Sequence, residues 1–123
     1  LYPDALDALR RLSARYRLAV VPNRHAEVHR IGIQEYFAAV VNARSVGYAK
    51  PDRRIFEAAC AAVGLPPEAV LHVGDDPDLD VRGAVAAGVR SAWINRHELP
   101  WIGEPVEMVA FADLTELCEW LGA

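Results

Sequence analysis

The sequence contains no apolar run that approaches the ~20 residues needed to cross a bilayer, and no signal peptide is visible at its start. It also has no excess of basic residues: 13 Lys and Arg are outnumbered by 17 Asp and Glu, and the net charge is −4. The basic side chains are scattered among acidic ones rather than gathered into a patch. We therefore expect a protein that neither spans a membrane nor binds nucleic acid.

Cysteine is also scarce, with only Cys60 and Cys118 in 123 residues. Each stands alone on the apolar side of a predicted helix. Isolated apolar positions favour reduced thiols in the core over a disulfide or a metal-binding pair. Because stable disulfides belong to oxidising compartments, this usage predicts a cytoplasmic location.

Apolar residues, in contrast, make up 53% of the chain, which is enough for a packed core and argues against disorder. Their spacing alternates between helical and strand-like patterns. Helices are predicted at residues 4–15, 26–31, 53–63, 79–87 and 113–121, and strands at residues 18–21, 39–42, 70–73, 91–95 and 107–111. This alternation predicts an α/β fold, with a mainly parallel sheet covered by helices on both faces.

The most informative segment is VLHVGDDPDLDVRGAVAAG, residues 70–88. A predicted strand ends at Gly74 and is followed by the carboxylates Asp75, Asp76, Asp78 and Asp80. Open α/β sheets place their sites at the carboxyl ends of strands, and clustered carboxylates suit a hard cation such as Mg²⁺. The alternative is an acidic helix N-terminus, where Asp is favoured by capping and by the helix dipole. From the residues alone, both interpretations stay open.

Two further polar residues, Asn23 and Lys50, also lie beside predicted strands or helices. Asn23 stands just past the strand at 18–21, where its amide could face an anion. Lys50 precedes Pro51, which restricts the Lys50 backbone to extended conformations and places it on a defined loop. A positioned ammonium beside a phosphate would act as a point charge. The alternative for Lys50 is an ordinary solvated surface lysine.

Three of these stretches together resemble the haloacid dehalogenase-like (HAD) hydrolase superfamily. They are LAVVPN, GYAKPDRRIFEAA and HVGDDPDLDVRGAVAAGVRSAWIN, which match the family's second, third and fourth motifs in order and spacing. The resemblance implies a Rossmann-like three-layer αβα core. It also implies a Mg²⁺-dependent phosphatase that acts on a small phosphorylated metabolite through an aspartyl-phosphate intermediate.

The resemblance also implies roles for individual residues. Asp75, Asp76 and Asp80 would be the metal ligands. Lys50 would neutralise the nucleophile and the phosphate, and Asn23 would lie beside the phosphate. The acidic GDD sequence looks like the phosphatase branch of the family rather than the dehalogenases, which need no cation at that position.

The chain departs from the family pattern in two respects. The first motif, DxDxT or DxDxV, which carries the nucleophilic Asp, is absent, and Pro22 stands where a Ser or Thr hydroxyl normally meets the phosphate. The chain begins at Leu1 without Met and opens on a predicted helix. We therefore expect residues 1–123 to be a partial core domain, without the nucleophile strand and the cap, and inactive as this fragment.

The absent motif has a structural consequence. In this family its strand lies between those represented here by residues 18–21 and 70–73, so two apolar strand edges would be left unpaired. We expect another polypeptide, a swapped partner or direct closure of the two strands to fill the gap. Two other functions remain possible: a non-catalytic HAD-like binding module, which the absent nucleophile and Pro22 favour slightly, or a signalling receiver domain. The receiver is disfavoured because Lys50 precedes the acids.

Overall fold

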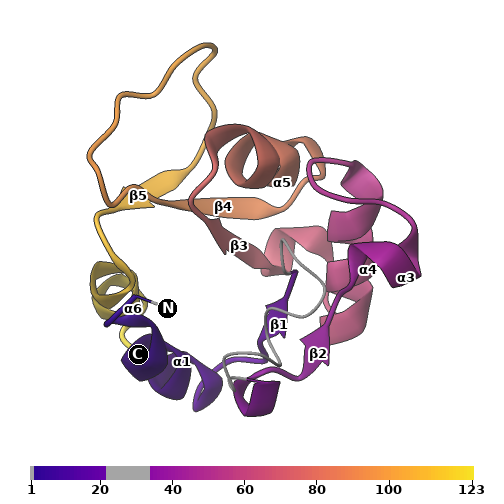
Figure 1. Cartoon of the computed structure of the whole chain (residues 1–123), viewed down its shortest axis with the longest axis horizontal. Helices are drawn as coiled ribbons and strands as arrows, with labels where there is room; N and C mark the ends of the chain where they lie inside the picture. Colours follow the sequence, from indigo (N-terminus) through magenta and orange to yellow (C-terminus); the bar gives the residue numbers. More distant parts are fainter. Residues whose placement is uncertain (1, 22–33) are drawn as a thin grey trace.

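The computed structural model describes residues 2–21 and 34–123, in which helices alternate with short strands (Figure 1). In chain order the elements are α1 (Ala5–Ser13), β1 (Ala19–Val20), η1 (Gln34–Tyr36), β2 (Ala39–Val40), α3 (Ala43–Val46), α4 (Arg53–Val63), η2 (Pro67–Ala69), β3 (Leu71–Gly74), η3 (Pro77–Arg82), α5 (Gly83–Ala86), β4 (Arg90–Ile94), β5 (Val109–Phe111) and α6 (Leu114–Leu121). The elements predicted within these residues are found close to their expected places, which confirms the α/β class. The helix predicted at 26–31 lies outside the described residues. None of the helices described is both long and apolar enough to cross a membrane.

Within residues 2–21 and 34–123 all strand pairs are parallel, but they form two sheets instead of the single predicted sheet. One sheet pairs β1 with β2, and the other has the order β3-β4-β5. Among the described residues no strand lies between β1 and β3, so both keep an open edge (Figure 1). The expected unpaired edges are therefore present, and direct closure of the two strands does not occur.

Local signals begin and end the helices as the sequence indicates. The Asp52 carboxylate accepts a hydrogen bond from the Arg54 amide at 2.9 Å and caps α4. Gly64 ends α4 in the left-handed conformation, with φ 72°, which a glycine adopts at little cost. At α6, the Asp113 carboxylate accepts from the Glu116 amide at 2.8 Å. These caps set the bounds of α4 and the start of α6.

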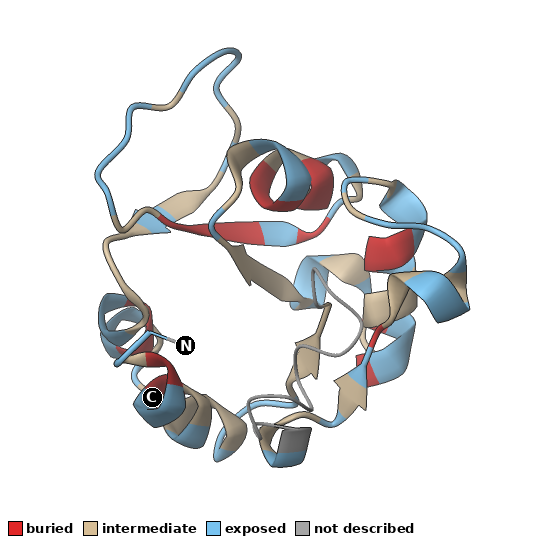
Figure 2. Ribbon diagram, viewed as in Figure 1, coloured by how far each residue is buried: buried red, intermediate tan, exposed pale blue. Residues whose placement is uncertain are grey.

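Two buried clusters pack the helices against the strands (Figure 2). The first joins α4 to α5 and the end of β2; its buried members are Val41, Ile55, Phe56, Cys60, Ala84 and Val89. The second packs α6 against β4; its buried members are Ala92, Ile94 and Leu117. Cys60 and Cys118 are both buried and free, as predicted. The first cluster also takes in Ala19 of β1 and Val70 before β3, so it links the two sheets on one side of the open edges.

A cavity of about 640 Å³ lies between these edges. Its wall is formed largely by apolar side chains of α1, β1, α4, β3 and α6. The wall also includes Lys50, His72, Asp75 and Asp80, which gather near the carboxyl end of β3. The open edges and three of the predicted site residues, Lys50, Asp75 and Asp80, therefore face one hollow.

Candidate active site

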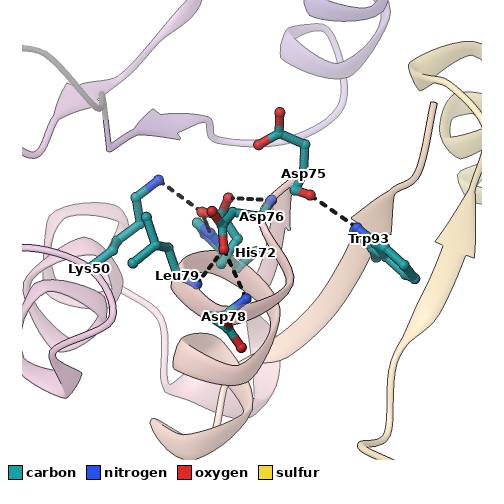
Figure 3. A network of polar contacts seen from close by, with 8 residues as sticks. Lys50, His72, Asp75, Asp76, Asp78, Leu79 and Trp93 are labelled. Atoms are coloured by element: carbon teal, nitrogen blue, oxygen red, sulfur yellow. Dashed lines mark hydrogen bonds and ion pairs between the residues drawn. The ribbon is translucent and has the colours of Figure 1, made fainter. Parts of the chain in front are cut away.

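A buried polar network that includes Lys50, His72 and Asp76 lies beyond β3 (Figure 3). Asp80 is its centre. Its Oδ1 accepts hydrogen bonds from Lys50 Nζ at 2.8 Å and His72 Nε2 at 2.9 Å. Its Oδ2 accepts one from the Asp76 amide at 3.1 Å. The side chains of Lys50 and Asp80 are only 10% and 6% exposed. The network therefore holds an ammonium group beside a carboxylate in a region largely shielded from water.

Gly74, the last residue of β3, makes this approach possible. A Cβ at position 74 would lie 2.2 Å from Asp80 Cγ and 2.5 Å from Asp80 Oδ2, far inside van der Waals contact. Only glycine leaves room for the carboxylate to fold back over the strand end. The glycine of the GDD sequence is thus required by packing against Asp80.

The charge of Asp80 is stabilised where it lies. Burial by itself would raise the pKa of Asp80. The hydrogen bonds from His72 and Lys50, together with the charge of Lys50, outweigh burial and hold the pKa of Asp80 well below its ordinary value. The carboxylate is therefore ionised at neutral pH, and it anchors Lys50 in one place.

Asp76 and Asp78 have different surroundings from Asp80. Asp76 Oδ1 accepts from the amides of Asp78 and Leu79 at 2.9 and 2.8 Å, and so caps η3. Asp78 is exposed, and its Oδ1 lies 3.3 Å from Nε of Arg82, one helical turn later. For Asp76, helix capping is therefore an observed role, in agreement with the alternative interpretation of the acidic run.

Asp75 has a free carboxylate at the end of β3. Its backbone carbonyl accepts a hydrogen bond from Trp93 Nε1 at 3.0 Å, which ties the residue to β4. Its side chain is exposed and points away from the Asp76 side chain (Figure 3). No side chain of the described residues bonds to this carboxylate. Asp75 is thus the acid of the cluster whose oxygens are open to an incoming ligand.

The donors fit a hard divalent cation only in part. Carboxylate oxygens are the ligands that Mg²⁺ prefers, and Asp75 offers two that are unengaged. In the part of the chain that the structure describes, however, no group of three His, Cys, Asp or Glu residues is placed to hold a metal ion. Asp75, Asp76 and Asp80 share one strand end, yet Asp76 and Asp80 direct oxygens to protein donors. Their assignment as metal ligands stays a prediction.

Of the two predicted phosphate-binding residues, Lys50 is in the described part of the chain and Asn23 is not. Lys50 lies on the cavity wall with Asp75 and Asp80, as the sequence predicts, and a cis peptide bond joins it to Pro51. It is a buried, paired lysine rather than a solvated one. Asn23 and Pro22 lie outside the described residues.

His72 is a residue whose importance the sequence analysis missed, since its apolar neighbours indicate only a core position. Alternation along a strand places His72 and Gly74 on the same face of β3. Because Asp80 packs over Gly74 on that face, His72 meets the same carboxylate. That two-residue spacing before the glycine is the signal that could have identified it.

The chain is similar to a known family of hydrolases. The profile of the haloacid dehalogenase-like hydrolases matches residues 1–88. A phosphoserine phosphatase from Thermus thermophilus is 37% identical over 123 residues, which cover 95% of this chain and 49% of the relative. A glyceraldehyde 3-phosphate phosphatase from Methanopyrus kandleri is 35% identical over 101 residues, which cover 77% of this chain and 43% of the relative.

A solved structure is similar over almost the whole chain. The crystal structure of a 2-haloacid dehalogenase from Pseudomonas syringae pv. Tomato DC3000 matches with a TM-score of 0.93 and 32% identity, over 99% of this chain and 53% of the other. The chain spans about half the length of the curated relatives it matches. These matches confirm the Rossmann-like HAD-type fold, and the chain belongs to the haloacid dehalogenase-like hydrolase family.

Proposed function

We propose that this chain is part of a Mg²⁺-dependent phosphomonoesterase that acts on a small phosphorylated metabolite through an aspartyl-phosphate intermediate. The observation that carries the proposal is the buried Lys50–Asp80 pair on the wall of the cavity, beside the open Asp75 carboxylate. The relatives named phosphoserine phosphatase and glyceraldehyde 3-phosphate phosphatase support this substrate class. The cytoplasmic location predicted from cysteine usage is part of the same proposal.

Lys50 would supply positive charge to the phosphate. An ammonium group has three N–H donors, and one of them is directed to Asp80. The others remain for phosphate oxygens, whose charge must be stabilised as the phosphoryl group moves. Asn23 would add a neutral donor to the phosphate. Asp80 keeps Lys50 in place and does not itself meet the substrate.

The expected Mg²⁺ would be held by Asp75, with Asp76 and Asp80 nearby. When bound, the cation supplies charge that neutralises the phosphate. Without a cation, the unpaired Asp75 carboxylate would repel any anionic substrate that entered the cavity. Because the resemblance implies that dehalogenases need no cation at this position, a carboxylate that requires one favours a phosphatase, although the similar structure from Pseudomonas syringae is named a 2-haloacid dehalogenase.

The nucleophile must come from outside the sequence motifs present here. We infer that a β-strand with an Asp at its carboxyl end fills the cavity between β1 and β3. Protein interiors are close-packed, so an apolar hollow of about 640 Å³ beside two open parallel edges is a place for missing structure. Because the chain matches only 49% and 43% of its relatives' length, we assign this strand to another segment of the same polypeptide.

Amide hydrogen exchange tests the strand assignment. In the full-length gene product, amides on the open edges of β1 and β3 should exchange slowly, whereas in the isolated 123-residue chain they should exchange fast. Sedimentation shows whether a swapped dimer supplies the strand instead. Equal, fast exchange in both proteins would refute the assignment.

A substrate panel tests the function. Hydrolysis of para-nitrophenyl phosphate and of 2-chloropropionate should be measured for the full-length gene product, with Mg²⁺ and with EDTA. We expect Mg²⁺-dependent release of nitrophenol and no release of chloride. Chloride release that needs no metal would favour a dehalogenase, and inactivity on a broad panel of phosphomonoesters and haloacids would favour the non-catalytic binding module.

A further inference from the structure

We propose that His72 is a positioning residue, which orients the Asp80 carboxylate and through it fixes the Lys50 ammonium toward the cavity. The proposal rests on the phosphatase function proposed above and extends it to a residue within β3. The observation behind the proposal is a single acceptor atom that Lys50 and His72 share. Asp80 Oδ1 accepts both from Lys50 Nζ at 2.8 Å and from His72 Nε2 at 2.9 Å.

The hydrogen-bond direction at His72 follows from the acceptor. An ionised carboxylate has no proton to donate, so His72 Nε2 must carry the hydrogen that lies between them. The Asp76 amide binds the other oxygen, Oδ2, at 3.1 Å. Donors on both oxygens fix the plane of the carboxylate, and His72 supplies one of the two on Oδ1.

The ring of His72 is itself held by packing. Its plane stands at 89° to the Phe56 ring, with centroids 5.0 Å apart, in an edge-to-face contact. Phe56 is only 2% exposed and belongs to the first buried cluster, and the His72 side chain is 15% exposed. The imidazole is therefore a rigid donor, whereas Lys50 is a long, flexible one.

Without the His72 donor, the Asp80 carboxylate would still be present but no longer held in one orientation. With only Lys50 on Oδ1, the Asp80 side chain could rotate, and the ammonium would move with it. A catalytic group displaced by about 1 Å can lose about a hundredfold in rate, while charge attraction to a substrate is less sensitive to position. We therefore expect the change to appear in kcat more than in KM.

The first test compares His72→Phe with His72→Gln in the full-length gene product, with para-nitrophenyl phosphate and Mg²⁺. Phenylalanine keeps an aromatic ring against Phe56 but has no donor, whereas glutamine can place an amide N–H near the former Nε2. We expect kcat to fall about tenfold to a hundredfold in His72→Phe, with KM changed less than about threefold, and to recover largely in His72→Gln. His97→Phe, at an exposed histidine, is the matched control.

The second test is a nitrogen-15 NMR spectrum of the same proteins, which needs no turnover. The wild type should show His72 as the Nε2–H tautomer and a resolved Lys50 ammonium signal, retained in His72→Gln and broadened in His72→Phe. A His72 that carries its proton on Nδ1 in the wild type would overturn the proposal. So would equal losses of kcat in both variants that track their melting temperatures, or an unchanged kcat in His72→Phe. If no phosphatase activity is found, the proposed function fails, and the spectra alone decide this inference.

Discussion

Gly74 and Asp80 are in direct contact: the carboxylate of Asp80 occupies the space in which any other residue at position 74 would place its Cβ. Because Gly74 has no side chain, the chain can turn through η3 after β3 and bring the buried Asp80 carboxylate back against the end of that strand. The positions of Lys50 and His72 depend on that return, because both bind Asp80.

Gly74→Ala should therefore be costly. The new methyl group must displace Asp80, and overpacking of this kind costs about 1–3 kcal/mol of unfolding free energy. Urea unfolding measures the loss. Gly47→Ala is the control, since a Cβ there meets nothing within 4 Å and pays only for its left-handed backbone, about 1 kcal/mol. A Gly74→Ala protein with wild-type stability would show that Asp80 is not packed against the strand end.

The Lys50–Asp80 pair should be strongly coupled in stability. Removing one partner of a buried ion pair leaves an uncompensated charge and costs about 3 kcal/mol or more. We expect Lys50→Met to destabilise the protein by about that amount, and Lys50→Met combined with Asp80→Asn to recover part of the loss. Urea unfolding of the two single variants and the double variant gives the coupling. The exposed pair Arg53–Glu57 serves as the control and should show coupling below about 1 kcal/mol. Additive single losses at Lys50 and Asp80 would contradict the buried pair.

Acid should remove the contribution of Asp80. Because its pKa is lowered in the folded state, the contribution is fully present above the unfolded value of about 3.8 and is lost as pH falls below it. The difference in unfolding free energy between the wild type and Asp80→Asn should therefore stay constant from about pH 7 to pH 5 and shrink from pH 4 toward pH 2. Asp52 is the comparison: the hydrogen bond from Arg54 lowers the pKa of this partly exposed residue to about 2. Asp52→Asn should have a smaller effect over the same range, since water screens its pair. A constant difference for Asp80 down to pH 2 would contradict the lowered pKa.

Asp75 should matter for Mg²⁺ and not for stability. Its carboxylate has no partner among the described residues, so Asp75→Asn should leave the melting temperature unchanged. In the full-length gene product, calorimetric titration should show Mg²⁺ binding weakened about tenfold or more, while Asp78→Asn stays within about twofold. EDTA should abolish activity in the wild type. Unchanged Mg²⁺ affinity in Asp75→Asn would remove Asp75 from the metal site.

The fold is largely predictable from local pattern, because helix and strand periodicities and caps act over a few residues. Asp52 and Gly64 bound α4 at the expected positions. The division into two sheets is different, because it depends on a strand that the motifs present do not include. The short helix α3 is also unpredicted, since a single turn has no periodicity to detect.

The candidate site is predictable as a location but not as a set of contacts. Strand ends and acid spacing place Lys50, Asp75 and Asp80 around one hollow. The sequence does not show that Asp76 turns to cap η3 while Asp80 turns inward to Lys50, because those directions depend on how the chain winds after Gly74. Similar side chains in one short run therefore acquire different roles.

The most direct test of the central claim is the hydrolysis of para-nitrophenyl phosphate by Lys50→Gln in the full-length gene product, measured beside the wild type with saturating Mg²⁺. Loss of one preorganised donor at a developing charge costs about a hundredfold to a thousandfold in kcat. We expect a loss of that size for Lys50→Gln and no measurable turnover by the isolated 123-residue chain. A Lys50→Gln enzyme that keeps wild-type kcat, or an isolated chain that hydrolyses the ester, would contradict it.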